Sequence, residues 1–127
     1  MHAPQNLRYT KSHEWVDAKD DGTASIGLTD YAQASLGDLV FVNLPEVDSS
    51  LQAGDVLCDV ESVKAVSDVY MPVSGAIAEV NEELDAAPER INESPYEAWI
   101  CVVKDVDGLS ELMSAADYEA YVATLDE

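Results

Sequence analysis

Residues 55–71 read DVLCDVESVKAVSDVYM, and their pattern limits the folds that the whole chain can adopt. Two short apolar-rich runs flank the four residues SVKA, which is typical of an antiparallel β-hairpin with a tight turn. Along the first run Val56, Cys58 and Val60 alternate with Leu57, Asp59 and Glu61, so one face of the strand can be buried while the other carries charge toward the turn. We expect that buried face to hold three side chains, Val56, Cys58 and Val60.

The sequence on both sides of this hairpin predicts further short strands separated by turns. Before it, residues 9–18 and 23–28 predict a hairpin, and Thr29 predicts the N-cap of a helix over residues 30–36 that stops at Gly37. The other expected segments are strands at 39–44, 76–80 and 98–103, a connector at 45–54 and an irregular or briefly helical stretch at 81–92. Many short strands with turn signals predict a mainly β sandwich or barrel with peripheral helices.

The last twenty residues, 108–127, have a helical pattern. Their apolar residues recur at helical spacing: Leu109, Leu112, Met113, Ala116, Tyr118, Tyr121, Val122 and Leu125. Ser114 and Asp117 resemble a capping box and mark the start of a second helix. We expect residues 108–127 to pack as one or two amphipathic helices on a single domain that spans residues 1–127.

The charge balance excludes several classes of partner. The chain has 26 acidic and 6 basic residues and a formal net charge of −20, which repels nucleic acid and anionic membranes.

No apolar run approaches the roughly 20 residues of a membrane span, and residues 1–9 lack a secretion signal, so we expect a cytoplasmic protein. We hypothesise a salt-rich cytoplasm, because at about 1 M salt the Debye length is only about 3 Å. The alternative is an acidic protein of an ordinary cytoplasm.

Few residues have the spacing of a catalytic or metal site. Cys58 and Cys101 lie in apolar runs and predict small buried hydrophobic side chains rather than a disulfide. His13 has no second ligand nearby, and His2 lies at the expected frayed terminus, so we expect no metal site. No nucleophile has a base at a recognised spacing, and we therefore expect no stand-alone enzyme.

Lys64 is the residue whose position invites a functional interpretation. It is the only basic residue between Lys19 and Arg90, and the predicted turn exposes it. A lysine amine on its four-carbon stem suits an amide-linked cofactor, and a hairpin tip presents it to a modifying enzyme. The alternative is an ordinary solvated turn lysine.

The lysine motif Glu61-Ser62-Val63-Lys64-Ala65 resembles the lipoylation site of the glycine cleavage system H proteins. Other motifs agree with that family in order: SHEW at 12–15, GLTDYAQ at 27–33, LGD at 36–38, VNLPE at 42–46, PVSG at 72–75 and IN at 91–92. The resemblance covers residues 7 to about 125. It implies a barrel-sandwich hybrid of the lipoyl/biotinyl-carrier type, with short helices and a C-terminal helical tail.

The resemblance implies a swinging-arm carrier in glycine catabolism. A lipoate ligase or a lipoyl/octanoyl transferase would attach lipoate to Lys64 as an amide. A pyridoxal phosphate (PLP)-dependent glycine decarboxylase would load the lipoyl group with an aminomethyl unit. A tetrahydrofolate-dependent aminomethyltransferase would take that unit into one-carbon metabolism, and dihydrolipoamide dehydrogenase would reoxidise the dithiol. The positions that match the family's cleft contacts are Ser12, Glu14 and Asp68, and the implied carrier is a monomer when free.

The sequence departs from the family pattern at two places. The run Pro95-Tyr96-Glu97-Ala98-Trp99 is one residue shorter than the family's and lacks its glycine, so we expect a different loop before the final strand. Asp48 stands where the family commonly has glycine, so a turn with positive φ is not expected there.

Three alternatives to this reading of Lys64 stay open. In a biotin carrier methionine usually flanks the lysine, and in the lipoyl domains of oxo-acid dehydrogenases Asp precedes it, whereas Lys64 lies between Val63 and Ala65. An H-like relay protein would donate lipoate to other lipoyl domains. The third alternative is an unmodified acidic interaction module.

Overall fold

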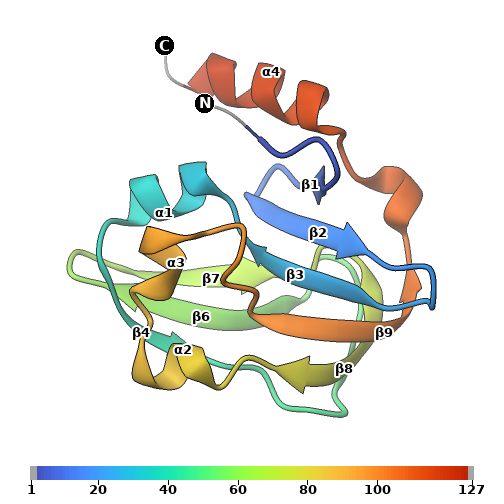
Figure 1. Ribbon diagram of the computed structural model, residues 1–127, viewed down its shortest axis with the longest axis horizontal. Coiled ribbons are helices and arrows are strands. Elements are labelled where there is room, and N and C mark those ends of the chain that lie inside the picture. The colour runs from blue at the N-terminus through green and yellow to red at the C-terminus, as the bar shows by residue number, and fades with distance from the viewer. Residues whose placement is uncertain (1–2, 126–127) are drawn as a thin grey trace.

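Two antiparallel sheets form the framework of the structure, a computed structural model that describes residues 3–125 (Figure 1). The strands of the larger sheet are, in order across it, β1 (Arg8–Tyr9), β2 (Glu14–Ala18), β3 (Ala24–Leu28), β9 (Cys101–Asp107), β8 (Ser74–Val80) and β5 (Ser50–Leu51). The strands of the smaller sheet are β4 (Leu39–Asn43), β6 (Val56–Ser62) and β7 (Val66–Tyr70). The predicted mainly β sandwich is therefore confirmed.

The core lies between the two sheets and is closed at one end by short helices. Both sheets contribute fully buried aliphatic side chains to it: Ile26, Ile77 and Val103 from the larger sheet, and Val42, Val60 and Val69 from the smaller. Leu84 from α2 (Glu83–Ala86) and Ile91 from α3 (Arg90–Glu93) complete the cluster. These two helices occupy the stretch that the sequence predicts to be irregular or briefly helical.

Helix α1 (Asp30–Leu36) has the boundaries and caps that the sequence predicts. The Thr29 hydroxyl accepts a hydrogen bond from the Ala32 N–H at 3.2 Å, and Gly37, with φ 83°, ends the helix. Asn92 then fixes this helix end, because its amide donates to the Gly37 carbonyl at 2.9 Å and its Oδ1 accepts from the Leu39 N–H at 2.9 Å. The start of β4 is thereby held against α3.

The β6–β7 hairpin is confirmed, but its buried face differs from the predicted one. Val60 and Cys58 are buried as expected, whereas Val56 is 50% exposed and Leu57 is buried instead. The pairing register with β7 shifts between Val56 and Cys58, which marks a β-bulge. A bulge adds one residue to a strand and so reverses the alternation beyond it.

The remaining strand boundaries depend on pairing between distant segments. The expected connector 45–54 contains the two-residue strand β5, which pairs with β8. The last strand begins at Cys101 rather than at residue 98 and extends to Asp107. Gly75 lies in β8. A Cβ there would come within 2.3 Å of Val103 Cγ1, so this position in the strand has no room for a side chain.

The two departures from the family pattern have different outcomes in the structure. Asp48 has φ 75°, so the turn with positive φ is kept, and the doubt about it was wrong. Aspartate tolerates this left-handed region better than most residues, and the Asp48 N–H donates to the Ile77 carbonyl at 2.8 Å. The shortened loop 95–99 folds into turns, and its Pro95 carbonyl accepts a hydrogen bond from Trp15 Nε1 at 3.0 Å.

The C-terminal segment forms a short 3-10 helix, η1 (Leu109–Glu111), and helix α4 (Ala115–Leu125). Ser114 Oγ accepts a hydrogen bond from the Asp117 N–H at 3.2 Å, which confirms the predicted start of the second helix. Helix α4 packs over β1 and β2 in a second apolar cluster: Ala3, Leu7, Tyr9, Trp15, Ala115, Tyr118 and Val122. Leu125, predicted on the apolar face, is 40% exposed, and residues 126–127 lie outside the described range. Among residues 3–125, no helix has the length and apolar character needed to cross a membrane.

Candidate functional site

The turn that carries Lys64 is held by a serine and by the segment after α1. Ser62 Oγ accepts hydrogen bonds from the N–H groups of Lys64 at 3.3 Å and Ala65 at 3.1 Å, and the Ser62 N–H donates to the Ala65 carbonyl at 2.8 Å. The Val63 N–H donates to the Asp38 carbonyl at 3.0 Å, which ties the tip of the hairpin to the body of the domain. The lysine is therefore presented on a fixed backbone.

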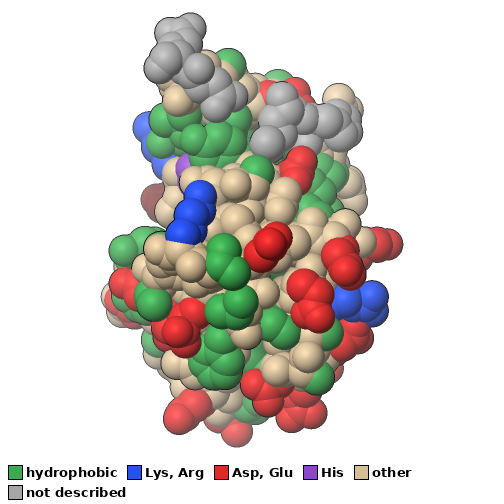
Figure 2. Space-filling model, turned by 90° about the vertical axis from the view of Figure 1, so that its left-hand side faces the viewer, with side chains coloured by type: hydrophobic (Ala, Val, Ile, Leu, Met, Phe, Trp, Pro, Cys, Tyr) green, Lys and Arg blue, Asp and Glu red, His purple; other side chains and the backbone are tan. Residues whose placement is uncertain are grey.

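The Lys64 side chain is exposed and lies across the end of α1. A Cβ placed on Gly37 would lie 3.5 Å from the Lys64 Cε, an ordinary van der Waals contact, which places the lysine stem beside the end of α1. Within residues 3–125 no carboxylate forms an ion pair with this ammonium. Exposed valines flank it, with Val63 69% and Val66 65% exposed. Figure 2 shows this end of the molecule, where hydrophobic side chains lie among acidic ones.

A cleft of about 120 Å³ lies between α1, the β6–β7 sheet and the turn before β2. One part of its wall is apolar and is formed by Leu28, Ala32, Leu36, Val60 and Val69. Its polar lining consists of Ser12, His13, Glu14, Ser35, Ser67 and Asp68. The structure thus brings together the three predicted cleft residues, although Asp68 lies more than fifty residues after Ser12 and Glu14 in the sequence.

Glu14 forms the buried polar floor of this cleft and is 1% exposed. Its Oε1 accepts hydrogen bonds from Thr10 Oγ1 at 2.6 Å and Ser12 Oγ at 2.5 Å, and its Oε2 accepts from the Tyr70 N–H at 3.3 Å. Burial raises the pKa of the Glu14 carboxyl, and the hydrogen bonds from Ser12, Thr10 and Tyr70 oppose that rise. Because no cation pairs with Glu14 within the described residues, the carboxylate can still accept from a positively charged group.

Asp68 lies on β7 at the rim of the same cleft and is exposed. Across the strand pair it lies opposite Asp59, whose carboxylate accepts a hydrogen bond from the Asn43 amide at 3.0 Å. Because the carboxyl groups of Glu14 and Asp68 both line the cleft, it favours binding of a small cationic group and disfavours binding of anions.

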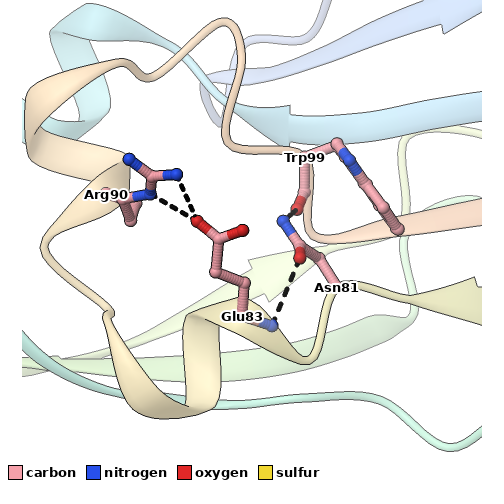
Figure 3. Close-up of polar contacts among 4 residues, drawn as sticks. All are labelled: Asn81, Glu83, Arg90 and Trp99. Atoms are coloured by element: carbon pink, nitrogen blue, oxygen red, sulfur yellow. Dashed lines mark hydrogen bonds and ion pairs between the residues drawn. The ribbon is translucent and has the colours of Figure 1, made fainter.

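A larger hollow of about 280 Å³ lies between α2, α3 and the loop before β9 (Figure 3). In Figure 3 Arg90 is paired with Glu83, and the Asn81 amide donates to the Trp99 carbonyl at 2.8 Å. These polar groups bind one another, and none of the predicted site residues lines this hollow. The cleft beside Lys64 is therefore the candidate site.

Comparison with known proteins identifies the family. A sequence model described as "Glycine cleavage H-protein" matches residues 7–125. The chain belongs to the glycine cleavage H-protein family. A "Probable glycine cleavage system H protein" of Pyrococcus furiosus is 58% identical over 124 residues, which cover 95% of this chain and 92% of that protein. A "Glycine cleavage system H protein" of Lachnoclostridium phytofermentans is 54% identical and covers 96% of each.

A solved structure supports the same assignment. The crystal structure of a glycine cleavage system H protein from Mycobacterium marinum has a TM-score of 0.89 and 40% sequence identity, and it covers 95% of this chain and 99% of that one. The family assignment makes the chain a lipoyl carrier component of the glycine cleavage system rather than an enzyme. The architecture predicted from the H-protein resemblance is confirmed.

The sequence interpretation of the site missed three contributors. Thr10 and the Tyr70 N–H hold the Glu14 carboxylate, and the His13 backbone shapes the turn before it. Thr10 left a signal, because its spacing from Ser12 and Glu14 places three polar groups at every second position. The Tyr70 N–H left none, since a backbone donor is the same in every residue. The His13 ring nitrogen Nδ1 lies within hydrogen-bond distance of the Tyr118 hydroxyl, at 2.8 Å, and His2 lies outside the described residues.

Proposed function

We propose that Lys64 carries the lipoyl group as an amide and that Ser12, Glu14 and Asp68 hold the cargo of the loaded arm. The observation that supports this most is the buried Glu14 carboxylate in a cleft beside an exposed lysine that no carboxylate pairs within residues 3–125. A buried carboxylate without a cationic partner is unfavourable for folding alone. A cation that binds in the cleft during function would offset that cost.

The lysine turn fits an attached acyl group. Amide formation removes the lysine charge, and no ion pair with a described residue is lost on modification. The attaching enzyme, a lipoate ligase or a lipoyl/octanoyl transferase, would recognise the motif that flanks the lysine: Glu61, Ser62, Val63 and Ala65. When bound, lipoate would supply a disulfide whose S–S bond opens as one sulfur takes up the aminomethyl unit and the other becomes a thiol. Removal of that unit would leave the dithiol, which is then reoxidised to the disulfide.

The cleft residues act on the ammonium group of the cargo. Glu14 and Asp68 would accept charge-assisted hydrogen bonds from it, which are shorter and stronger than neutral ones. The Ser12 hydroxyl, which donates to Glu14 at 2.5 Å, orients the carboxylate. The apolar wall excludes water from the cargo, and water is the reactant that releases it as formaldehyde and ammonium.

The proposed partners follow from this carrier role. They are a PLP-dependent glycine decarboxylase, a tetrahydrofolate-dependent aminomethyltransferase and dihydrolipoamide dehydrogenase. We further propose that the carrier is a cytoplasmic monomer when free, formed by one domain over residues 1–127 with 108–127 packed on it. A lipoate relay protein would need Lys64 but would have no use for a buried carboxylate in the cleft, so Glu14 favours the glycine cleavage role.

The acidic surface supports a second, independent proposal, that the protein is adapted to high salt. Acidic side chains are spread over the face in Figure 2, and the net charge is −20. Screening at molar salt removes most of the self-repulsion. We expect the unfolding midpoint to rise between low salt and about 1 M KCl. A midpoint that stays constant or falls contradicts the salt adaptation and leaves the carrier role intact.

The cleft is tested with substitutions that remove one charge each. In lipoylated protein loaded with the one-carbon unit, Glu14→Gln and Asp68→Asn should shorten the lifetime of the cargo, while the lipoyl mass on Lys64 stays. Asp59→Asn is the matched control, because it removes the same charge opposite Asp68 but outside the cleft lining. If the cargo is lost no faster from Glu14→Gln and Asp68→Asn than from the Asp59→Asn control, Glu14 and Asp68 do not hold it.

A further inference from the structure

The turn before β2 has a histidine at a position that usually requires glycine. The His13 N–H donates to the Thr10 carbonyl at 3.1 Å, and the Thr10 N–H donates to the Glu14 carbonyl at 3.1 Å. This pattern is a three-residue hairpin loop whose last residue takes the left-handed conformation, and His13 has φ 73°. Glycine is preferred at such a position, so a histidine there is strained.

The His13 ring is held by groups from two helices. Its Nδ1 lies 2.8 Å from the Tyr118 hydroxyl of α4, and that hydroxyl lies 2.7 Å from Thr29 Oγ1 at the start of α1. Thr29 Oγ1 also accepts a hydrogen bond from the Ala32 N–H, so the Tyr118 hydroxyl lies between the His13 ring and the cap of α1. The ring also lies 4.5 Å, centroid to centroid, from that of Tyr31. This chain of hydrogen bonds links α4, α1 and the turn.

The same turn determines where the Glu14 carboxylate lies. Thr10, which precedes the loop, and Ser12, its second residue, donate to Glu14 Oε1, and the left-handed backbone at His13 closes the turn that brings these groups back toward Glu14. The His13 carbonyl also accepts from the Thr29 N–H at 3.0 Å, which fixes the turn to the cap of α1. Helix α1 forms the opposite wall of the cleft.

We propose that His13 and Tyr118 are positioning residues for Glu14, so that the C-terminal helix holds the cargo cleft in its binding geometry. The role in cargo retention rests on the proposed function above. The positioning of Glu14 does not, because it concerns side chains of the unmodified chain. Helix α4 then has a task in the carrier besides covering its apolar cluster.

The test compares two substitutions one turn apart on α4. Tyr118→Phe keeps the ring, which stacks on Tyr9 at 4.7 Å, and removes the hydroxyl. Tyr121→Phe is the matched control, because its ring also lies beside His13, at 6.1 Å, and no hydrogen bond of its hydroxyl is found within residues 3–125. His13→Gly is a second variant that keeps the left-handed backbone and removes only the ring.

The first readout uses the unmodified protein and follows the Glu14 carboxyl carbon by ¹³C NMR during a pH titration. In Tyr118→Phe and His13→Gly the turn loosens, so water reaches Glu14 and lowers its pKa, while weaker hydrogen bonds from Thr10 and Ser12 raise it. Because burial has the larger effect on this carboxyl, we expect a net downward shift of roughly half a unit. Tyr121→Phe should match the wild type. A Glu14 pKa that is unchanged in both test variants overturns the proposal.

The second readout is the lifetime of the cargo on the lipoylated chain. Loss of one hydrogen bond predicts a lifetime about threefold to tenfold shorter in Tyr118→Phe. The same substitution should have no effect in a Glu14→Gln background, because Tyr118 acts through Glu14. A shortening that persists there indicates a general loosening and overturns the positioning role. Wild-type protein that never acquires a lipoyl group would refute the proposed function instead, and the NMR readout would still decide the positioning.

Discussion

Gly27→Ala tests the packing on the face of the larger sheet that α4 covers. Gly27 on β3 lies directly opposite Trp15 on β2. A Cβ at Gly27 would lie 2.5 Å from both Cε2 and Cζ2 of the indole, well inside van der Waals contact. Trp15 is 3% exposed and donates from Nε1 to the Pro95 carbonyl at 3.0 Å, so the ring has little space in which to move.

The expected loss of stability has two parts. Forcing extra volume into a well-packed core costs about 1–3 kcal/mol. Moving the indole also breaks its hydrogen bond to Pro95, which contributes about 0.5–1.5 kcal/mol. The total is about 1.5–4.5 kcal/mol. The unfolding entropy is roughly 2.1 cal/mol/K per residue, hence roughly 0.27 kcal/mol/K for this chain, so Tm should fall by about 6–17 °C.

Calorimetry and urea unfolding measure this loss, and a double-mutant cycle identifies its cause. If the clash with the indole is responsible, Gly27→Ala should cost much less in a Trp15→Leu background, with a coupling of at least about 1 kcal/mol. Gly22→Ala is a control, since Gly22 has φ 86° but no atom within 4 Å of a built Cβ, and it reports backbone strain without a clash. A Gly27→Ala protein within about 0.5 kcal/mol of the wild type would refute the reasoning.

Three further substitutions or modifications test other parts of the structure. Burial raises the pKa of Glu14, so the folded state binds this proton more tightly than the unfolded chain and stability falls as pH rises through that range. The change in urea midpoint from wild type to Glu14→Gln should therefore be more favourable at about pH 7 than at about pH 4. The same change at both pH values contradicts this. Thr29→Ala loses the cap of α1 and the bond to Tyr118, and guanidinium unfolding should show a loss of about 1–2 kcal/mol. Burial raises the pKa of both cysteine thiols, that of Cys101 to about 12, so a thiol reagent should label Cys58 and Cys101 only after unfolding. Rapid labelling of the native protein would show that these thiols are accessible.

Local signals made part of the fold predictable from the sequence. The helix over 30–36 was predicted with its boundaries because its start and end depend on neighbouring residues, the Thr29 hydroxyl and the Gly37 backbone. Ser114 acts in the same way at the start of α4. The exposed Val56 was not predictable, because the bulge that turns it outward arises from the register with β7. The short strand β5 likewise exists only through its pairing with β8.

In the candidate site too, features set by neighbouring residues were predictable and features set by distant contacts were not. Lys64 was found from its turn and its motif, which lie within five consecutive residues. The cleft residues Ser12, Glu14 and Asp68 were carried over from the family, and the structure places them around one cleft. The His13 turn was not predictable, because histidine seldom adopts the left-handed backbone and the partner of its ring, Tyr118, lies more than a hundred residues away.

The central claim is that Lys64 carries the lipoyl group. Intact and peptide mass spectrometry of the protein from its native host tests it most directly. The account predicts a lipoyl amide on Lys64 and on no other lysine. A biotinyl group on Lys64 would move the chain to another class of carrier, and an unmodified Lys64 during growth on glycine would contradict the proposed function.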